Sequence, residues 1–341
     1  MYDVMAVGNA LVDHEYLLSD EQLTSTSLAK GSMTLASLEE QTQLLSEFET
    51  NDLQPSKQTG GGSAANAMFA FACLGGKAFY GCRVGNDHAG QFYLDDLNQA
   101  GVATCNTKST VEGGVTGSCV VAITPDGERT MQTFLGTSSE IDDANIDFEA
   151  LAQSKWLYLE GYLSMSASLH PALQKLRQQA KDNHTKIAVS FADPAVVNFA
   201  KDGLLQMLGD GVDVIFCNVE EAKLFTGADD IKAAAQALTD FCQLAVVTSG
   251  AQDTMICERS EAGQLSLIQV ATPKVDTVID TNGAGDNYSG AFLYALANDC
   301  TLTQCGQLAG QVASQVVQQF GPRLSLEQYQ SIAQQVLSAR S

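Results

Sequence analysis

Residues 187–217 read IAVSFADPAVVNFAKDGLLQMLGDGVDVIFC and place two short apolar runs on either side of a helix-length segment. The runs at 187–191 and 212–217 are rich in β-branched and aromatic residues and have the length of buried strands. The segment between them is long enough for a helix to carry the chain back to the same edge of a sheet, which makes the two strands parallel. This stretch therefore predicts an α/β fold.

The same alternation continues on both sides of this stretch. Further strand-like runs lie at 156–159 and 244–248, again separated by helix-length segments. In one such segment Leu169, Leu173, Leu176 and Ala180 recur at the spacing of one helical face. We therefore expect a central, mostly parallel sheet with helices on both sides, and a ligand site where its strands end.

Two segments, about 11–59 and about 102–135, have a different character. The first contains Ser37 and Glu40 at the spacing of a helix capping box. The second contains two β-like runs, 117–124 and 129–135, joined by the turn sequence Pro-Asp-Gly, which predicts a β-hairpin. Polar, β-rich insertions of this kind often form a lid, so we expect a single domain over residues 1–341 whose lid is built from these two segments.

Composition excludes several classes of protein. The chain has 341 residues and a formal net charge of -22, which argues against binding nucleic acid or an anionic membrane surface. Its nine cysteines contain no C-x-x-C pair and lie mostly in apolar runs, as expected for reduced thiols in a cytoplasmic protein. Neither a signal peptide nor an apolar run of the ~18 residues needed for a membrane span is evident.

The sequence DTNGAGDNYSGAFL at 280–293 predicts an anion-binding helix start. Small residues at Gly283, Ala284 and Gly285 precede an apolar helix, so unpaired N–H groups converge at its positive end. Asp286 places a carboxylate beside them. Either it begins the helix in a purely structural role, or it is a general base that takes a proton from an attacking hydroxyl.

A second glycine cluster, GGGSAAN at 60–66, opens another apolar helix. Glycines at this position allow a ligand to approach the backbone closely. Asn66 is a strong hydrogen-bonding group within a helix that otherwise looks buried, and burying an unpartnered amide costs a few kcal/mol. Its partner is therefore a hydroxyl-bearing ligand or, alternatively, the backbone of the core.

Neither cluster fits a Walker A loop or a dinucleotide-binding G-x-G-x-x-G motif. Together they resemble the two signatures of the ribokinase-type (PfkB) carbohydrate kinase family, in the family's order. Further matches to the family lie at Gly8-Asn9 with Asp13, at 83–90, at Asn218 with Glu221, and at 247–250. Within the family, the stretches at 8–13, 248–254 and 280–286 are most similar to those of adenosine kinases.

The resemblance implies a ribokinase-like three-layer sandwich with a small β-rich lid. It also implies an ATP-dependent enzyme that phosphorylates the primary (5′) hydroxyl of a ribose-containing substrate, adenosine above all. Asp286 would be the general base, and Gly283, Ala284 and Gly285 the anion hole for the moving phosphoryl group. The implied cofactor is Mg²⁺, and the family also suggests K⁺ near the Asp280 loop.

The resemblance assigns the remaining site residues as follows. The residues implied for the substrate are Asn9, Asp13, Gly61, Gly62, Ser63, Asn66, Tyr162 and Arg129, of which Asn9 and Tyr162 would line the base. Arg129 is equally compatible with a solvated strand position. The residues implied for ATP are Asn218, Glu221, Thr248, Ser249, Gly250, Ala313, Ser314 and Val317, of which the first two would also organise Mg²⁺ through water.

Two other functions remain open from the sequence. One is a kinase of ribose, fructose or a related free sugar. The other, from a different class, is a regulatory protein that binds a nucleoside or sugar without chemistry. We expect a small-molecule partner, no nucleic acid or membrane partner, and either a monomer or a homodimer.

Overall fold

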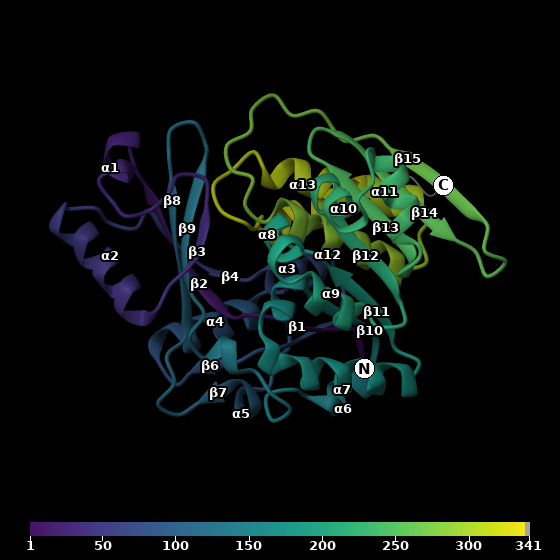
Figure 1. The fold of residues 1–341 in the computed structure, drawn as a ribbon, viewed down its shortest axis with the longest axis horizontal. Coiled ribbons are helices and arrows are strands. Elements are labelled where there is room, and N and C mark those ends of the chain that lie inside the picture. Colours follow the sequence, from purple (N-terminus) through teal and green to yellow (C-terminus); the bar gives the residue numbers. More distant parts are fainter. Residues whose placement is uncertain (338–341) are drawn as a thin grey trace.

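The computed structural model describes residues 1–337 as a large sheet and a small sheet with their helices, together with a third sheet of only two strands (Figure 1). The large sheet has the order β15-β14-β13-β12-β11-β10-β1-β5. Every neighbouring pair from β5 to β13 is parallel, whereas the pairs β13–β14 and β14–β15 are antiparallel. Its strands are β1 (Tyr2–Val7), β5 (Ala78–Gly81), β10 (Ser154–Glu160), β11 (Lys186–Ser190), β12 (Val212–Asn218), β13 (Cys242–Ser249), β14 (Gln252–Arg259) and β15 (Leu265–Val270).

Helices cover both faces of the large sheet, as its alternating burial requires. Val4 and Ala6 of β1 pack in one apolar cluster, whereas Met5 and Val7 pack in the other. The first cluster contains residues of α3 (Ser63–Cys73), α4 (His88–Gln99), α12 (Ala284–Ala297), α13 (Leu302–Val316) and α14 (Leu326–Leu337). The second contains residues of α6 (Phe148–Ala152), α7 (His170–Asp182), α8 (Pro194–Phe199), α9 (Lys201–Leu208), α10 (Val219–Thr226) and α11 (Ile231–Leu238). The predicted three-layer α/β sandwich is therefore confirmed.

The small sheet has the order β3-β9-β8-β2-β4 and lies beside the large one (Figure 1). Its strands are β2 (Leu11–Leu17), β3 (Met33–Leu35), β4 (Lys57–Gly61), β8 (Gly117–Ile123) and β9 (Arg129–Phe134). Helices α1 (Asp20–Thr24) and α2 (Leu38–Thr50) cover its outer face through an apolar cluster that includes Phe48 and Val120. Ser37 and Glu40 form the capping box of α2, and β8 and β9 form the hairpin, as the sequence predicts.

The segment from 102 to 111 does not join the small sheet. Ala103 pairs with Phe79 at the edge of the large sheet, and β7 (Thr110–Val111) pairs with β6 (Val84–Gly85) after the short helix α5 (Asn106–Ser109). Short 3₁₀ turns at Gly136–Glu140, Gly161–Met165 and Ala167–Leu169 complete the described elements. All nine cysteines are free thiols. Within the described part of the chain, no helix is both long and apolar enough to cross a bilayer.

Candidate active site

A cavity of about 390 Å³ lies between the small sheet and the ends of the large-sheet strands. A volume of this size is at the lower end of the range for small-molecule sites. Many of the residues predicted for the site line it: Asn9, Asp13, Gly62, Ser63, Asn66, Arg129, Tyr162, Asn218, Glu221, Thr248, Gly283, Ala284, Gly285 and Asp286. The fold therefore brings together residues that are up to 277 positions apart in the sequence, from Asn9 to Asp286.

Five predicted residues do not line this cavity, besides Gly61, which lies just behind it at the end of β4. Ser249 is the last residue of β13, and Gly250 lies in the turn that follows it. Ala313, Ser314 and Val317 lie at the end of α13, where the Val317 carbonyl accepts a hydrogen bond from the N–H of Ile279 at 2.7 Å. Their predicted contact with the adenine of ATP thus stays a prediction about a surface next to the cavity.

Asp286 lies in the first turn of α12 and receives two hydrogen bonds from α3. Ser63 Oγ donates to Asp286 Oδ1 at 2.6 Å, and Asn66 Nδ2 donates to Asp286 Oδ2 at 3.0 Å. Burial raises the pKa of the Asp286 carboxyl, while these two donors oppose the rise. The Asn66 amide thus has side-chain partners within the protein, neither a ligand nor the core backbone, and the role of Asp286 as a base stays a prediction.

Gly62 shows why the second cluster is built of glycine. Its φ of 94° lies in the left-handed region, and a Cβ there would come within 2.3 Å of the Asn9 carbonyl oxygen. Tyr93 donates to the carbonyl of the preceding Gly61 at 3.0 Å. The close approach of the Asn9 and Gly62 backbones brings Asn9 to the N-terminus of α3 and hence into the cavity.

Asp13 is a buried carboxylate with no partner. Its residue is 7 % exposed, and among residues 1–337 no donor hydrogen-bonds to its side-chain oxygens. Burial raises the pKa of Asp13 to about 7, with the charge of Arg323 opposing the rise. An unpartnered buried carboxylate is costly for structure, so we infer that a ligand supplies the missing donors.

Asn218 and Glu221 hydrogen-bond to each other. Asn218 is the N-cap of α10 and accepts from the Glu221 N–H at 2.9 Å, while the two Glu221 oxygens accept from the Asn218 side chain and backbone at 2.6 and 2.9 Å. Burial raises the pKa of Glu221 to about 7. Within residues 1–337 no group of three or more His, Cys, Asp or Glu side chains is placed to hold a metal. The Glu221 lone pairs that these contacts leave free suit water-mediated binding of Mg²⁺, and the role of Asn218 and Glu221 in that binding stays a prediction.

Arg129 reaches from β9 of the small sheet to the loop before α12. Its Nε lies 3.3 Å from Asp280 Oδ1, and its Nη2 donates to Thr281 Oγ1 at 3.3 Å. Asp280 also accepts from the N–H groups of Asn282 and Gly321 at 2.8 and 3.0 Å. Three protein groups thus contact the Asp280 carboxylate, and K⁺ near this loop stays a prediction.

The sequence reasoning missed three residues of this region. Glu160, at the end of β10, is fully buried and accepts from the N–H groups of Asn9 and Ala64 at 2.8 and 2.7 Å. Asp193 lines the cavity and accepts from the Tyr162 hydroxyl at 3.3 Å. Arg323 donates to Asn66 Oδ1 at 2.9 Å. Glu160 could have been predicted as a site residue, because it ends a predicted parallel strand and ligands bind at such strand ends. No pattern in the sequence around Arg323 indicates a place in the site.

The buried carboxylates predict how stability depends on pH. Burial raises the pKa of Asp13 and Glu160 to about 7, above the 3.8 and 4.5 of the unfolded chain. The folded chain therefore holds these protons to higher pH, and the free energy of unfolding falls as pH rises from about 5 to about 8. We expect the thermal unfolding temperature to drop over this window by several degrees, measured by calorimetry without ligand.

A pair of variants checks the cause of this pH dependence. Asp13→Asn removes one of the titrating groups and should flatten the curve, whereas the exposed Asp202→Asn on α9 should leave its slope unchanged. An unfolding temperature that rises between pH 5 and 8 in the parent protein would contradict the raised pKa values.

Comparison with known proteins gives one family. Residues 27–328 match the model of the pfkB family of carbohydrate kinases. The adenosine kinase of Schizophyllum commune is 26% identical over 94% of this chain and 96% of its own length. The crystal structure of adenosine kinase from Sinorhizobium meliloti superposes with a TM-score of 0.88 at 29% identity, covering 98% of this chain and 99% of that one. A probable sugar kinase from Rhizobium etli CFN 42 superposes equally well, with a TM-score of 0.88, 29% identity and 98% of both chains covered.

Proposed function

The chain belongs to the pfkB family of carbohydrate kinases and is an ATP-dependent kinase, and on this premise we propose that it phosphorylates the 5′ hydroxyl of adenosine. Membership of the family indicates a kinase of nucleosides or sugars but does not select the substrate. The choice of adenosine is supported by the similarity to adenosine kinases over nearly the whole chain and by the chemistry of the cavity wall.

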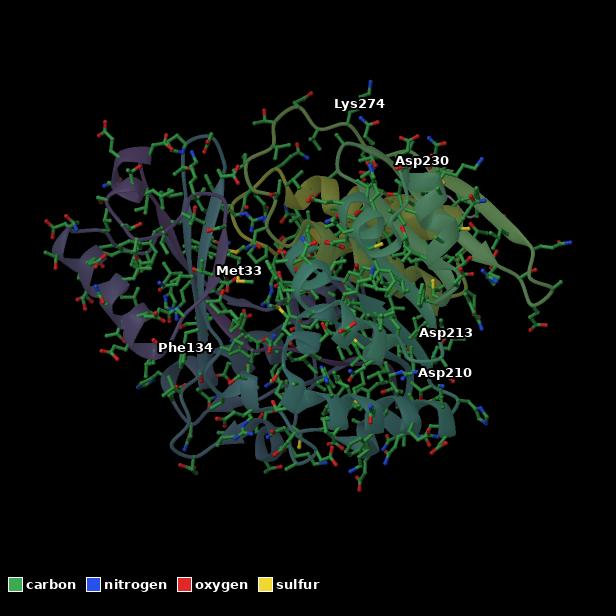
Figure 2. The ribbon with its side chains drawn as sticks, in the orientation of Figure 1. Met33, Phe134, Asp210, Asp213, Asp230 and Lys274 are labelled. Carbon is green, nitrogen blue, oxygen red and sulfur yellow. The ribbon has the colours of Figure 1, made fainter. Side chains whose placement is uncertain are left out.

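One face of the small sheet carries the proposal. Alternate residues of its strands line the cavity, and apart from Asp13, Arg129 and Thr133 they are apolar: Leu11, Met33, Leu35, Cys119, Val121 and Met131. Figure 2 shows Met33 between the small sheet and the rest of the molecule. An apolar wall suits a flat purine, whereas a free sugar offers hydroxyls on every side and leaves such a wall unused. Asp13 would accept hydrogen bonds from the ribose hydroxyls.

Asp286 is proposed as the general base. Ser63 and Asn66 fix both of its oxygens, so the carboxylate is oriented before substrate binds. Burial raises its pKa toward neutrality, which makes it a better proton acceptor for a hydroxyl at the operating pH. It would take the proton as the 5′ oxygen attacks the γ-phosphoryl group of ATP in line.

The start of α12 is proposed as the anion hole. Gly283 is its N-cap, and no side chain of the described residues caps the helix. The Ala284 N–H donates to the Thr281 carbonyl at 3.3 Å, which leaves the N–H groups of Gly285 and Asp286 for the transferring phosphoryl group, whose negative charge the helix end favours. Arg129 is the only cationic side chain among the described residues that line the cavity, and it lies beside this loop.

Magnesium fits the residues on the ATP side. Asn218 and Glu221 would hold it through water, with Thr248 lining the same side of the cavity. Bound there, Mg²⁺ would offset the charge of the ATP phosphates in a cavity lined by several carboxylates. Ser249, Gly250, Ala313, Ser314 and Val317 are proposed to flank the rest of the nucleotide.

We propose that the small sheet acts as the lid of a single kinase domain. Its inner face lines the cavity, and its outer face is covered by α1 and α2 of the same chain. Closure would exclude water, which would otherwise hydrolyse ATP. Because α1 and α2 already cover the outer face, this lid needs no second copy of the chain to shield it, and we propose that it functions within one monomer.

A panel of substrates tests the choice of adenosine. We expect ADP release with Mg·ATP and adenosine to show a kcat/KM at least ten times that with ribose or fructose, because only the nucleoside covers the apolar wall. Activity confined to free sugars would replace adenosine by a sugar and leave the kinase mechanism standing. Nucleoside binding measured by calorimetry without any ADP release would favour the non-catalytic binding protein instead.

A further inference from the structure

Arg323 lies between α13 and α14, outside the cavity, with a side chain that is only 7 % exposed. Its Nε donates to Asn66 Oδ1 at 2.9 Å, its Nη1 pairs with Asp96 of α4, and its guanidinium lies 4.5 Å from the centre of the Phe69 ring. Two helices distant from Arg323 in sequence, α3 and α4, therefore hold its planar cation in a fixed orientation.

The contact with Arg323 determines which way the Asn66 amide points. A guanidinium has only donors, so it can meet only the oxygen of the amide. The amide nitrogen must then face the opposite side, where Asn66 Nδ2 donates to Asp286 Oδ2 at 3.0 Å. With the amide reversed, its oxygen would face the carboxylate and repel it.

We propose that Arg323 is a positioning residue, which fixes the Asn66 amide so that its NH₂ group holds the Asp286 carboxylate in place for the transfer. The proposal rests on the proposed role of Asp286 as the base. Arg323 itself touches neither substrate nor the reacting atoms; it acts through Asn66.

The glycine at position 60 belongs to the same arrangement. A Cβ on Gly60 would lie 2.6 Å from Asp96 Oδ2 and 3.2 Å from Arg323 Nη1. The first glycine of the 60–62 cluster thus makes room for the ion pair behind the site, whereas Gly62 shapes the cavity itself. A ligand-binding role alone does not account for a glycine at position 60.

The charges around Asp286 predict a further effect of Arg323. Burial raises the pKa of Asp286, and the two cations near it, Arg129 and Arg323, lower that pKa. The acidic groups that interact with Asp286 lie on β2, on β10 and the turn that follows it, and on α10: Asp13, Tyr158, Glu160, Tyr162 and Glu221. Removing Arg323 takes away one of the two cations that favour the charged form of Asp286, so Asp286 would hold its proton to higher pH.

Arg323→Met is the direct test. We expect kcat to fall about tenfold at pH 7, and the acid limb of the kcat/KM profile to move up by roughly 0.5–1 pH unit. Arg323→Lys keeps the charge but lacks the planar fork, so it should shift the acid limb less while kcat stays low. An unshifted acid limb and a normal kcat in both variants would overturn the proposal.

Arg177→Met is the matched control. Arg177 is a second buried arginine paired with an aspartate, Asp210, through Nη2 at 2.8 Å. Its helix α7 packs on the other face of the large sheet, and Figure 2 shows Asp210 well away from Met33 and the small sheet. We expect this variant to lose stability without a change in the pH profile. If the acid limb of Arg177→Met moved as far as that of Arg323→Met, the shift would reflect a general loss of stability and would contradict the positioning role.

Combination with Asn66→Ala tests the route of action. If Arg323 acts through Asn66, the double variant should be little worse than Asn66→Ala alone, and the two effects should fail to add. Fully additive losses would contradict positioning through Asn66. If Arg323→Met does not fold, Asp96→Asn releases the guanidinium from its other side and should lower kcat in the same direction, which Arg177→Met should not do.

The outcome for Asp286 separates this inference from the proposed function. Full activity in an Asp286→Asn variant would show that Asp286 is not the base, and Arg323 would then have no base to position. An inactive Asp286→Asn variant beside a normal Arg323→Met variant would leave the proposed function standing and refute the positioning role alone.

Discussion

Replacement of Asp286 by asparagine is expected to lower kcat by ~10²-fold or more while leaving ATP binding nearly unchanged. The change is almost isosteric but removes the proton acceptor. In the structure Ser63 and Asn66 each donate to one oxygen of this carboxylate, so the new amide nitrogen must face one donor. The Ser63 hydroxyl can rotate to accept, whereas the amide of Asn66 is held by Arg323, so the side chain should keep its position.

Measurement of kcat with Mg·ATP and adenosine, together with ATP affinity by calorimetry, checks this result. Asp202→Asn is the control, because Asp202 also lies in the first turn of a helix but is exposed on α9. It removes the same charge from the chain without touching the cavity. Activity near that of the control in Asp286→Asn would take Asp286 out of the base role.

The second large effect is expected for Asp13→Ala, which should lower kcat/KM for adenosine by about 10²-fold. The Asp13 carboxylate has no partner among residues 1–337 and would accept two hydrogen bonds from the ribose hydroxyls. Two hydrogen bonds to a charged group, at about 1.5 kcal/mol each, correspond to roughly that factor. The unfolding temperature of the ligand-free variant at pH 8 should rise, because a buried, unpaired charge has been removed.

Deoxyadenosines show whether the lost contacts are those to the ribose. A substrate that lacks the 2′ or 3′ hydroxyl already lacks one contact, so Asp13→Ala should reduce its kcat/KM less than that of adenosine. Equal losses for adenosine and both deoxyadenosines would place Asp13 outside the ribose site. A lower unfolding temperature at pH 8 would show that Asp13 has structural partners in solution.

The sequence predicted those parts of the fold that depend on local pattern. The runs at 187–191 and 212–217 became β11 and β12, and Ser37 with Glu40 capped α2, because burial and capping are decided by neighbouring residues. Pairing between distant segments was harder to foresee. The segment from 102 to 111 has the polar character of the lid, yet its pairing partners are Phe79 and β6 in the rest of the chain.

Most residues that a sequence motif names lie at the cavity, and their roles stay predictions. The glycine clusters led to Gly62, Asn66 and Asp286, all of which line the cavity. The residues that the sequence did not indicate are those that contact motif residues without belonging to a motif themselves. Arg323 reaches Asn66 across 257 positions of sequence, and nothing in the run Gly321-Pro322-Arg323 indicates that contact. Buried ion pairs of this kind are formed by tertiary packing and leave no periodic signal.

The position of β1 in the large sheet sets an order for folding during synthesis. β1 lies between β5 and β10, and Val4 pairs with both Ala78 and Trp156. At ribosomal rates of about 5–20 residues per second, β1 has one edge unpaired for on the order of 10 s until β10 emerges. From β10 to β15 each strand pairs with the one made just before it, so this half of the sheet can grow as it is translated. The β1–β5 pair, by contrast, keeps one edge of β1 open until β10 is made, and it is at this edge that a nascent chain would need a chaperone.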